Sequence, residues 1–158
     1  MDAEWQHRNF KRTVDVGRDS EYLSGGLRLG YRLDNDARLE VSGRLFDEDA
    51  DRARYANDGY RLGISGETGI QGLGDTTLYG YYTFEDLQHD GVEPVFDLAR
   101  DEKEHNATIG VRYTFGGVNR YLDDWILDAS YTHTTNDSNV ALYDYDRNQI
   151  GVSIRRSF

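Results

Sequence analysis

Histidine and carboxylate side chains are the groups in this sequence that could support acid–base chemistry. The four histidines are His7, His89, His105 and His133. Two candidate pairs with neighbouring acids are His105 with Glu104 and His133 with Asp137. Catalysis by such groups needs a nucleophile beside a base and a third group that orients the base. No spacing in the sequence fixes that arrangement, so we expect no catalytic residue and no enzymatic activity.

A run of acids could hold a divalent cation. It comprises Asp47, Glu48, Asp49 and Asp51. The run lacks the central glycine and the distal glutamate of a calcium-binding EF-hand loop. We therefore predict at most a weak Ca²⁺ or Mg²⁺ loop, which could bridge to lipopolysaccharide phosphates, and no dedicated metal site. The glycines show no phosphate-cradling spacing, so we also expect no cofactor.

Composition narrows the class of protein. The 158 residues contain no cysteine, which excludes a disulfide scaffold, a zinc ribbon and a thiol nucleophile. A net charge of −11 argues against nucleic acid as a partner. No stretch approaches the roughly 18 apolar residues of a membrane-spanning helix. Residues 1–158 are expected to form one domain, and the absence of a signal peptide at Met1 predicts a mature or truncated form.

Alternation of apolar and polar residues dominates the chain. In the clearest segment, Leu27, Leu29 and Tyr31 alternate with Arg28 and Arg32. Such a period of two predicts β-strands. The predicted strands lie at about Glu4–Phe10, Tyr22–Leu33, Arg38–Leu45, Tyr60–Ser65, Leu78–Phe84, Ala107–Phe115, Trp125–Thr132 and Gln149–Arg155. The expected fold is an all-β, antiparallel, up-and-down transmembrane β-barrel with about eight strands here, complete or part of a larger barrel.

The predicted connections alternate between short and long. Short turns are expected at Asp34–Asp36, Gln71–Gly74 and Gly116–Leu122. Long acidic loops are expected at Lys11–Asp19, Phe46–Gly59, Glu85–His105 and Thr135–Arg147. Short turns at one end and long polar loops at the other are typical of outer-membrane barrels. Aromatic residues near both strand ends, such as Tyr60, Phe84 and Trp125, predict girdles at the two membrane interfaces.

The polar positions of these strands are expected to line the inside of the barrel. The predicted basic set is Arg28, Arg32, Arg38, Arg44, Arg61, Arg112 and Arg155. The predicted acidic set is Glu40, Glu67 and Asp128. A net positive lumen follows from these sets. It would be a plug of paired charges if eight strands close, or an anion-favouring channel if the barrel is wider.

The end of the chain carries a resemblance to known families. An apolar alternating strand ends in an aromatic residue, with Ile150, Val152, Ile154 and Phe158 in the key positions. This pattern resembles the signal by which the barrel assembly machinery recognises outer-membrane proteins, although Arg156 stands where an apolar residue is usual. Residues 136–154, NDSNVALYDYDRNQIGVSI, look like the final loop and strand of barrels that follow tetratricopeptide repeats, namely the surface lipoprotein assembly modifier family and related export barrels.

This resemblance implies the C-terminal part of a translocation barrel, or a small barrel with the same closing hairpin. The repeats and additional strands of that family are not present in the sequence. The leading hypothesis is a non-enzymatic pore or translocation barrel in the bacterial outer membrane, with an arginine-rich lumen. The alternative is a small closed barrel that serves as a membrane anchor or binds partners through acidic extracellular loops. Under either hypothesis, the expected partners of the protein are outer-membrane lipid, lipopolysaccharide and the barrel assembly machinery.

Overall fold

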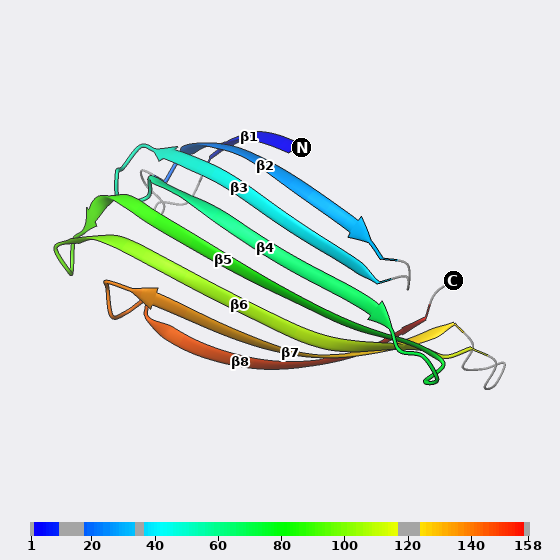
Figure 1. Ribbon diagram of the computed structural model, residues 1–158. Helices are drawn as coiled ribbons and strands as arrows, with labels where there is room; N and C mark the ends of the chain where they lie inside the picture. Colours follow the sequence, from blue (N-terminus) through cyan, green and yellow to red (C-terminus); the bar gives the residue numbers. More distant parts are fainter. Residues whose placement is uncertain (1, 10–17, 34–36, 117–123, 157–158) are drawn as a thin grey trace.

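A computed structural model describes residues 2–9, 18–33, 37–116 and 124–156. These residues form one eight-stranded antiparallel sheet whose strand order follows the chain (Figure 1). The strands are β1 (Asp2–Arg8), β2 (Ser20–Arg32), β3 (Arg38–Ala50), β4 (Asn57–Gly69), β5 (Asp75–Glu93), β6 (Leu98–Thr114), β7 (Trp125–Ser138) and β8 (Tyr145–Arg156). The predicted all-β, antiparallel, up-and-down architecture with about eight strands is confirmed. None of the described residues forms a helix able to cross a membrane.

The register of the strands sorts the side chains into two faces. Val41 lies opposite both Leu29 and Ile64, and one position away Glu40 lies opposite Gly30 and Ser65. Side chains directly opposite each other in a sheet share a face, and successive residues alternate between faces. We call the side with Leu29, Val41 and Ile64 the apolar face, and the side with Arg28 and Glu40 the polar face. The alternation seen in the sequence therefore runs through the whole sheet.

Several strands are longer than the sequence predicts. β5 continues as far as Glu93, and β6 begins already at Leu98. Most of the long loop expected at residues 85–105 is therefore paired strand. β3, β4, β7 and β8 likewise take up most of the loops predicted at residues 46–59 and 135–147. The prediction was wrong because it used apolar alternation to locate strand ends. Backbone pairing does not require apolar side chains, and charged residues continue the ladder beyond the apolar stretch.

The opposite ends of the strands keep the predicted tight turns where the structure describes them. Between β4 and β5, Gly72 and Gly74 adopt positive φ values of 85° and 64°. Glycine enters this region at no steric cost, which explains its use in the turn predicted at Gln71–Gly74. The turn at residues 34–36, most of that at 116–122 and most of the connection at 11–19 lie outside the described residues.

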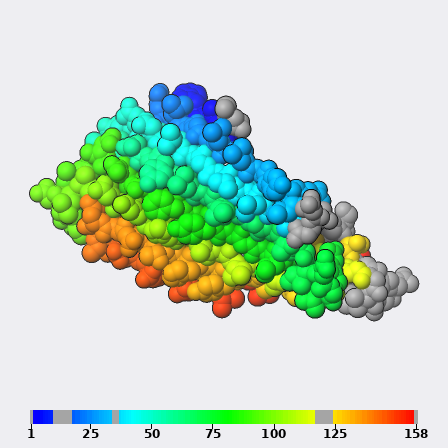
Figure 2. Space-filling view, in the orientation of Figure 1, coloured from blue at the N-terminus to red at the C-terminus, as the bar shows by residue number. Residues whose placement is uncertain are grey.

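The sheet has almost no apolar core. Among the described residues, the buried apolar side chains are Ala56, between β3 and β4, and Val140, between β7 and β8. Both lie at the end of the sheet opposite the tight turns, which we call the loop end. Large apolar residues of the apolar face are instead exposed, including Leu29 at 74% and Ile150 at 83%. The polar face is the more covered side: on β6, Thr108 and Gly110 are buried while Ile109 between them is exposed. The sheet, which is arched in Figure 1 and drawn in space-filling form in Figure 2, therefore curves toward its polar face.

Both edges of the sheet are open in the part of the chain that the structure describes. β1 pairs with Ser20–Gly26 of β2, and β8 pairs with β7 on its inner side. β1 and β8 are not paired with each other and lie along opposite edges of the arch (Figure 1). All twelve residues of β8 are exposed. The sheet is thus an open arch and not a closed cylinder.

The polar face makes Gly110 sensitive to substitution. A Cβ atom at this position would collide with the ring of Tyr79, whose hydroxyl donates a 2.7 Å hydrogen bond to Asp128. We expect Gly110→Ala to displace Tyr79 and to lower the free energy of unfolding by about 1–3 kcal/mol, the usual range for a hydrogen bond to a charged group. The shift of the urea midpoint measures this effect. Gly25→Ala is the control, because no atom lies within 4 Å of the added Cβ.

Candidate functional site

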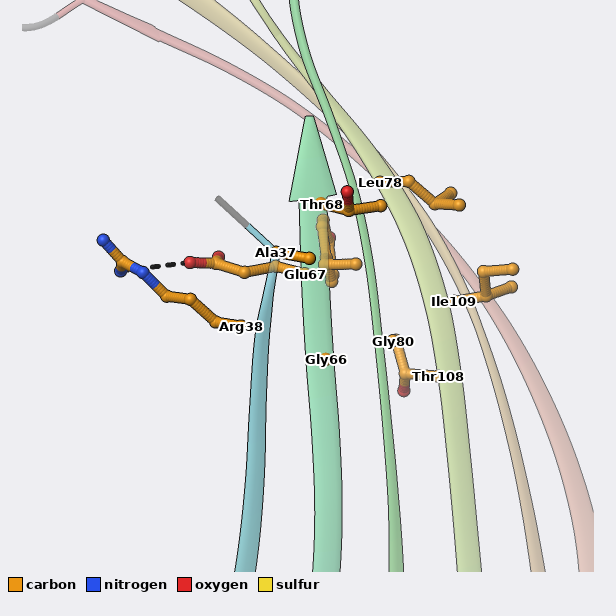
Figure 3. A pocket seen from close by; sticks show the side chains of 10 residues that line it. Ala37, Arg38, Gly66, Glu67, Thr68, Leu78, Gly80, Thr108 and Ile109 are labelled. Carbon is orange, nitrogen blue, oxygen red and sulfur yellow. Dashed lines mark ion pairs between the residues drawn. The ribbon is translucent and has the colours of Figure 1, made fainter. Parts of the chain in front are cut away.

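The candidate site is the sheet itself, with one apolar face and one polar face. Figure 3 shows both faces of β3–β6 near the tight turn between β4 and β5: Leu78 and Ile109 point to one side, and the ion pair of Arg38 with Glu67 lies on the other. On the apolar side, Gly66 and Gly80 face each other across β4 and β5 and help to line a shallow hollow of about 460 Å³. The hollow is open and mostly apolar, and it contains no arrangement suited to catalysis.

Charged residues border the apolar face at the loop end. Leu45 is followed on that face by Asp47, which lies opposite Asp58 of β4. On β5, Phe84 is followed by Asp86, which lies opposite Tyr60. Aromatic rings and a histidine stand just inside this border, where Phe84 contacts Tyr60 at a centroid distance of 5.8 Å and His105 at 4.9 Å. The apolar area is therefore a band that ends abruptly on the side of the loop end.

Cross-strand ion pairs dominate the polar face. Arg112 of β6 contacts Asp128 of β7 at 3.1 Å, and Arg28 of β2 contacts Glu40 of β3 at 3.3 Å. Two further pairs also link neighbouring strands: Arg38–Glu67 and Arg61–Glu85. Others join β1 to β3 across β2: Arg8–Glu48, and Arg44 with both Asp2 and Glu4. Since these groups are partly exposed, each pair contributes little stability alone, but together they form a hydrated, ion-paired surface.

Arg44 shows how small residues make room for these pairs. It reaches from β3 across β2 to the carboxylates of β1, passing Ser24, whose hydroxyl accepts a 2.9 Å hydrogen bond from it. A Cβ atom at Gly26 would lie 2.9 Å from the carbonyl oxygen of Gly43 and 3.5 Å from the Arg44 Cβ atom. The side chain of any other residue would crowd this path, so the glycine supports the long ion pair.

The predicted excess of arginine on the polar face is wrong. All of the arginines predicted for the polar face lie on it, and so do the predicted acids Glu40, Glu67 and Asp128. The longer strands and β1 add further acids, however: Asp2, Glu4, Glu48, Glu85, Glu102 and Glu104. The sequence reading assigned most of these acids to loops. The polar face is consequently close to charge balance and not net positive.

Most of the acids of the predicted cation loop lie in a strand. Asp47, Glu48 and Asp49 are strand residues of β3, so their side chains alternate between the two faces and cannot converge on one ion. Glu48 instead accepts hydrogen bonds from Arg8 at 2.8 Å and Ser20 at 2.5 Å, while Asp51 follows the end of the strand. No group of three or more metal-ligating side chains is found among the residues that the structure describes.

The histidine–acid neighbours in the sequence do not form acid–base pairs. Glu104 and His105 are successive strand residues and point to opposite faces. His105 Nδ1 lies 2.6 Å from the Tyr82 hydroxyl, and His133 Nδ1 lies 2.9 Å from Asn148. The partners of these two histidines are thus a tyrosine hydroxyl and an asparagine amide, and the absence of enzymatic activity stays a prediction.

One polar cluster at the loop end was not predicted. His89, Arg100 and Glu102 meet inside the β5–β6 hairpin, where Arg100 donates a 2.6 Å hydrogen bond to His89 Nε2 and lies 3.6 Å from Glu102. Asn136 of β7 donates to Glu102 at 3.2 Å, and Tyr143 stacks on Arg100 at 4.0 Å. Sequence spacing could not reveal this cluster, because it depends on the unpredicted extension of β5 and β6.

The cluster ties two connections into one cap. Asn139, between β7 and β8, accepts a hydrogen bond from the Asp101 amide at 2.9 Å and donates to the Ala99 carbonyl at 2.7 Å. Thr134 and Asn136 below them are buried, as is Val140. The loop end is therefore an ordered surface built from β5–β6 and β7–β8. It carries several exposed acids, among them Asp90, Asp97 and Asp101.

The residues of the predicted assembly signal fall on the open edge. Ile150, Val152 and Ile154 lie on the apolar face of β8 with exposures of 83%, 71% and 61%. Phe158 lies outside the described residues. The alternation expected for a terminal signal strand is present, and recognition by an assembly machinery stays a prediction.

Together, these features define an all-β protein built as a single antiparallel sheet, with an exposed apolar face and an ion-paired polar face. The chain belongs to the family described as protein of unknown function (DUF2860), whose family model matches residues 4–155. No curated protein and no solved structure matches the chain. The family description provides no link to barrels that follow tetratricopeptide repeats, so that resemblance stays a prediction.

The Glu102 cluster predicts a loss of stability in acid. Although burial alone would raise it, the neighbouring His89, the charge of Arg100 and the hydrogen bond from Asn136 hold the pKa of Glu102 below its ordinary value of 4.5. A lowered pKa stabilises the folded state fully above pH 4.5, and this contribution is lost as the pH falls below that value. The protection of the β5–β6 amides against hydrogen exchange, taken relative to the intrinsic exchange rate at each pH, should therefore fall below pH 4.5.

The control for this measurement is Glu102→Gln, which cannot lose a proton in this range. Its exchange should be fast already at neutral pH and should show a smaller acid-dependent step. An unchanged step in the variant would assign the acid response to other groups.

Proposed function

We propose that the chain forms the wall of a β-barrel in the outer membrane of a bacterium. The observation that supports this most strongly is the exposed apolar face of a sheet that has almost no apolar core. In water, such a face would greatly exceed the few hundred Å² of apolar patch typical of soluble monomers. In a bilayer, lipid covers the same face, and burial of this apolar surface becomes the main stabilising contribution.

The dimensions of the apolar face agree with this proposal. On β2 its apolar residues extend from Leu23 to Tyr31, close to the roughly 9–11 residues that a tilted strand needs to cross the hydrocarbon layer. The border of Asp47, Asp58 and Asp86 then lies at the level of the lipid head groups. Tyr60, Phe84 and His105 just below it take the interfacial position that amphipathic rings favour.

We propose a non-enzymatic pore or translocation role, with the polar face turned toward a hydrated interior. The ion pairs of this face keep its charged groups satisfied without a second protein layer. A path lined in this way suits polar solutes or an extended chain. Because acids balance arginines along the wall, we expect little preference for anions over cations.

The ordered cap supports a second candidate function. β5 and β6 are 19 and 17 residues long, and their ends rise past the apolar band to form an acidic surface with the β7–β8 connection. In this alternative the barrel is an anchor, and the cap binds a partner outside the cell. Outer-membrane lipid, lipopolysaccharide and the barrel assembly machinery are proposed partners in both cases, the last through the apolar edge residues of β8.

Neighbouring residues of β7 test which face meets lipid. Ala129 lies on the apolar face and Ser130 on the polar face. We expect Ala129→Arg to impair membrane insertion by up to about 2–4 kcal/mol, because its charge would lie within the hydrocarbon, whereas Ser130→Arg should insert nearly normally. Leu29→Arg and Val111→Arg should behave like Ala129→Arg. Equal effects at Ala129 and Ser130 would contradict the assignment of the faces. Insertion is measured by refolding into lipid vesicles.

Electrophoresis and conductance distinguish the two functions. The chain is refolded in detergent and compared unheated and boiled, then added to a planar bilayer. A pore should give steady current with little ion selectivity, and an anchor should insert without current. Solubility without detergent, with no association to vesicles, would overturn both functions.

A further inference from the structure

The arginines of β8 differ from those of the inner strands. On β1–β6, Arg8, Arg28, Arg38, Arg44, Arg61 and Arg112 each contact a carboxylate. On β8, Arg147 stacks on Tyr145 at 5.8 Å, and Arg155 has no polar partner among the described residues. Both lie on the polar face. The edge of β8 therefore presents unsatisfied backbone groups together with cationic side chains.

The edge of β1 has the complementary character. Asp2 and Glu4 lie on the polar face, and their side chains remain 52% and 42% exposed although Arg44 contacts both. Trp5 lies on the apolar face with 64% exposure. A strand pairing with β8 needs apolar residues on one face and acids on the other, and β1 supplies both.

We propose that β1 and β8 of the same chain pair in the membrane and close the sheet into an eight-stranded barrel, with Arg155 beside Asp2. This inference rests on the membrane location in the proposed function, because open strand edges are tolerated in water but not in hydrocarbon, where each unsatisfied backbone group costs several kcal/mol. Because side chains fill the interior of an eight-stranded barrel, closure favours the anchor over the pore. Eight is also the smallest usual number of strands for such a barrel.

The geometry of closure limits the register to a few values. Following paired residues across the sheet from Asp2 through Gly26, Arg44, Arg61, Glu85, Glu104 and Asn136 leads to Tyr145. A closed barrel with strands tilted by about 35–45° and spaced by about 4.8 Å shifts this line by roughly 8 to 12 residues per circuit. The shift must be an even number of residues, because side chains must stay on their own face.

A shift of about ten residues, in the middle of this range, fits the charges. It places Asp2 opposite Arg155 and Trp5 opposite Val152. A shift shorter by two residues would instead set Arg8 opposite Arg147, and like charges facing each other across strands are destabilising. The chosen register also places Ala3 and Trp5 beside Ile154 and Val152, which continues the apolar band across the seam.

Cysteine cross-linking of the full chain tests the seam on a clean background, because the sequence contains no cysteine. Trp5→Cys is combined in turn with Ile150→Cys, Val152→Cys and Ile154→Cys, and each variant is refolded into vesicles and oxidised. We expect an intramolecular disulfide predominantly with Val152→Cys, since Cα atoms more than about 7 Å apart are not readily bridged. Trp5→Cys with Leu23→Cys, paired across β1 and β2, is the positive control.

The outcomes separate closure from insertion. Predominant cross-linking to position 150 or 154 would overturn the register. Disulfide-linked dimers would overturn pairing within one chain in favour of a second copy. An inserted chain without any cross-link to β8 would overturn closure while leaving the membrane proposal intact, whereas failure of the cysteine-free chain to insert would overturn the proposed function itself.

A charge variant provides a second measurement. Arg155→Glu should slow cross-linking of Trp5→Cys with Val152→Cys several-fold, because it sets a carboxylate beside Asp2 and Glu4. Arg156→Glu is the matched control, since Arg156 is the next residue along β8 and lies on the other face. Equal rates in the two variants would contradict a contact between Arg155 and the acids of β1.

Discussion

The structure depends on one constraint: a single antiparallel sheet cannot bury its own apolar face. The strands satisfy nearly all of their backbone groups laterally, but no second layer covers Leu29, Val41 or Ile64. Most soluble domains solve this problem by packing two layers around a core. The sheet described here does not, so the medium or a partner must cover the face. Every functional proposal above follows from that requirement.

The sequence revealed the strands and their faces because both depend on the period-two alternation, which is local. Leu27, Leu29 and Tyr31 identify β2 and its apolar side without knowledge of any neighbour. The ends of the strands were predicted poorly, because the alternation changes at the border of the apolar band while backbone pairing continues. Asp86 and Glu102 were thus assigned to a loop, although both lie in paired strands.

The charge of the polar face was misjudged for the same reason. An ion pair such as Arg44 with Asp2 joins strands that are not adjacent, and Arg61 with Glu85 involves an acid beyond the predicted end of its strand. The arginines could be placed on a face by counting in twos. Their partners could not, because the register between strands and the true strand lengths are properties of the whole sheet. The same holds for the His89–Arg100–Glu102 cluster.

The pattern of paired and unpaired charges also carries information about the missing neighbour. In a sheet whose arginines pair with acids on other strands, an edge arginine without such a partner marks the position where a neighbouring strand should bring one. β8 shows this at Arg155, and β1 shows exposed acids at the other edge. Closure would therefore satisfy the backbone and the charges together. A wider barrel would satisfy the same edges with other strands, but those strands would also need acids on their polar face.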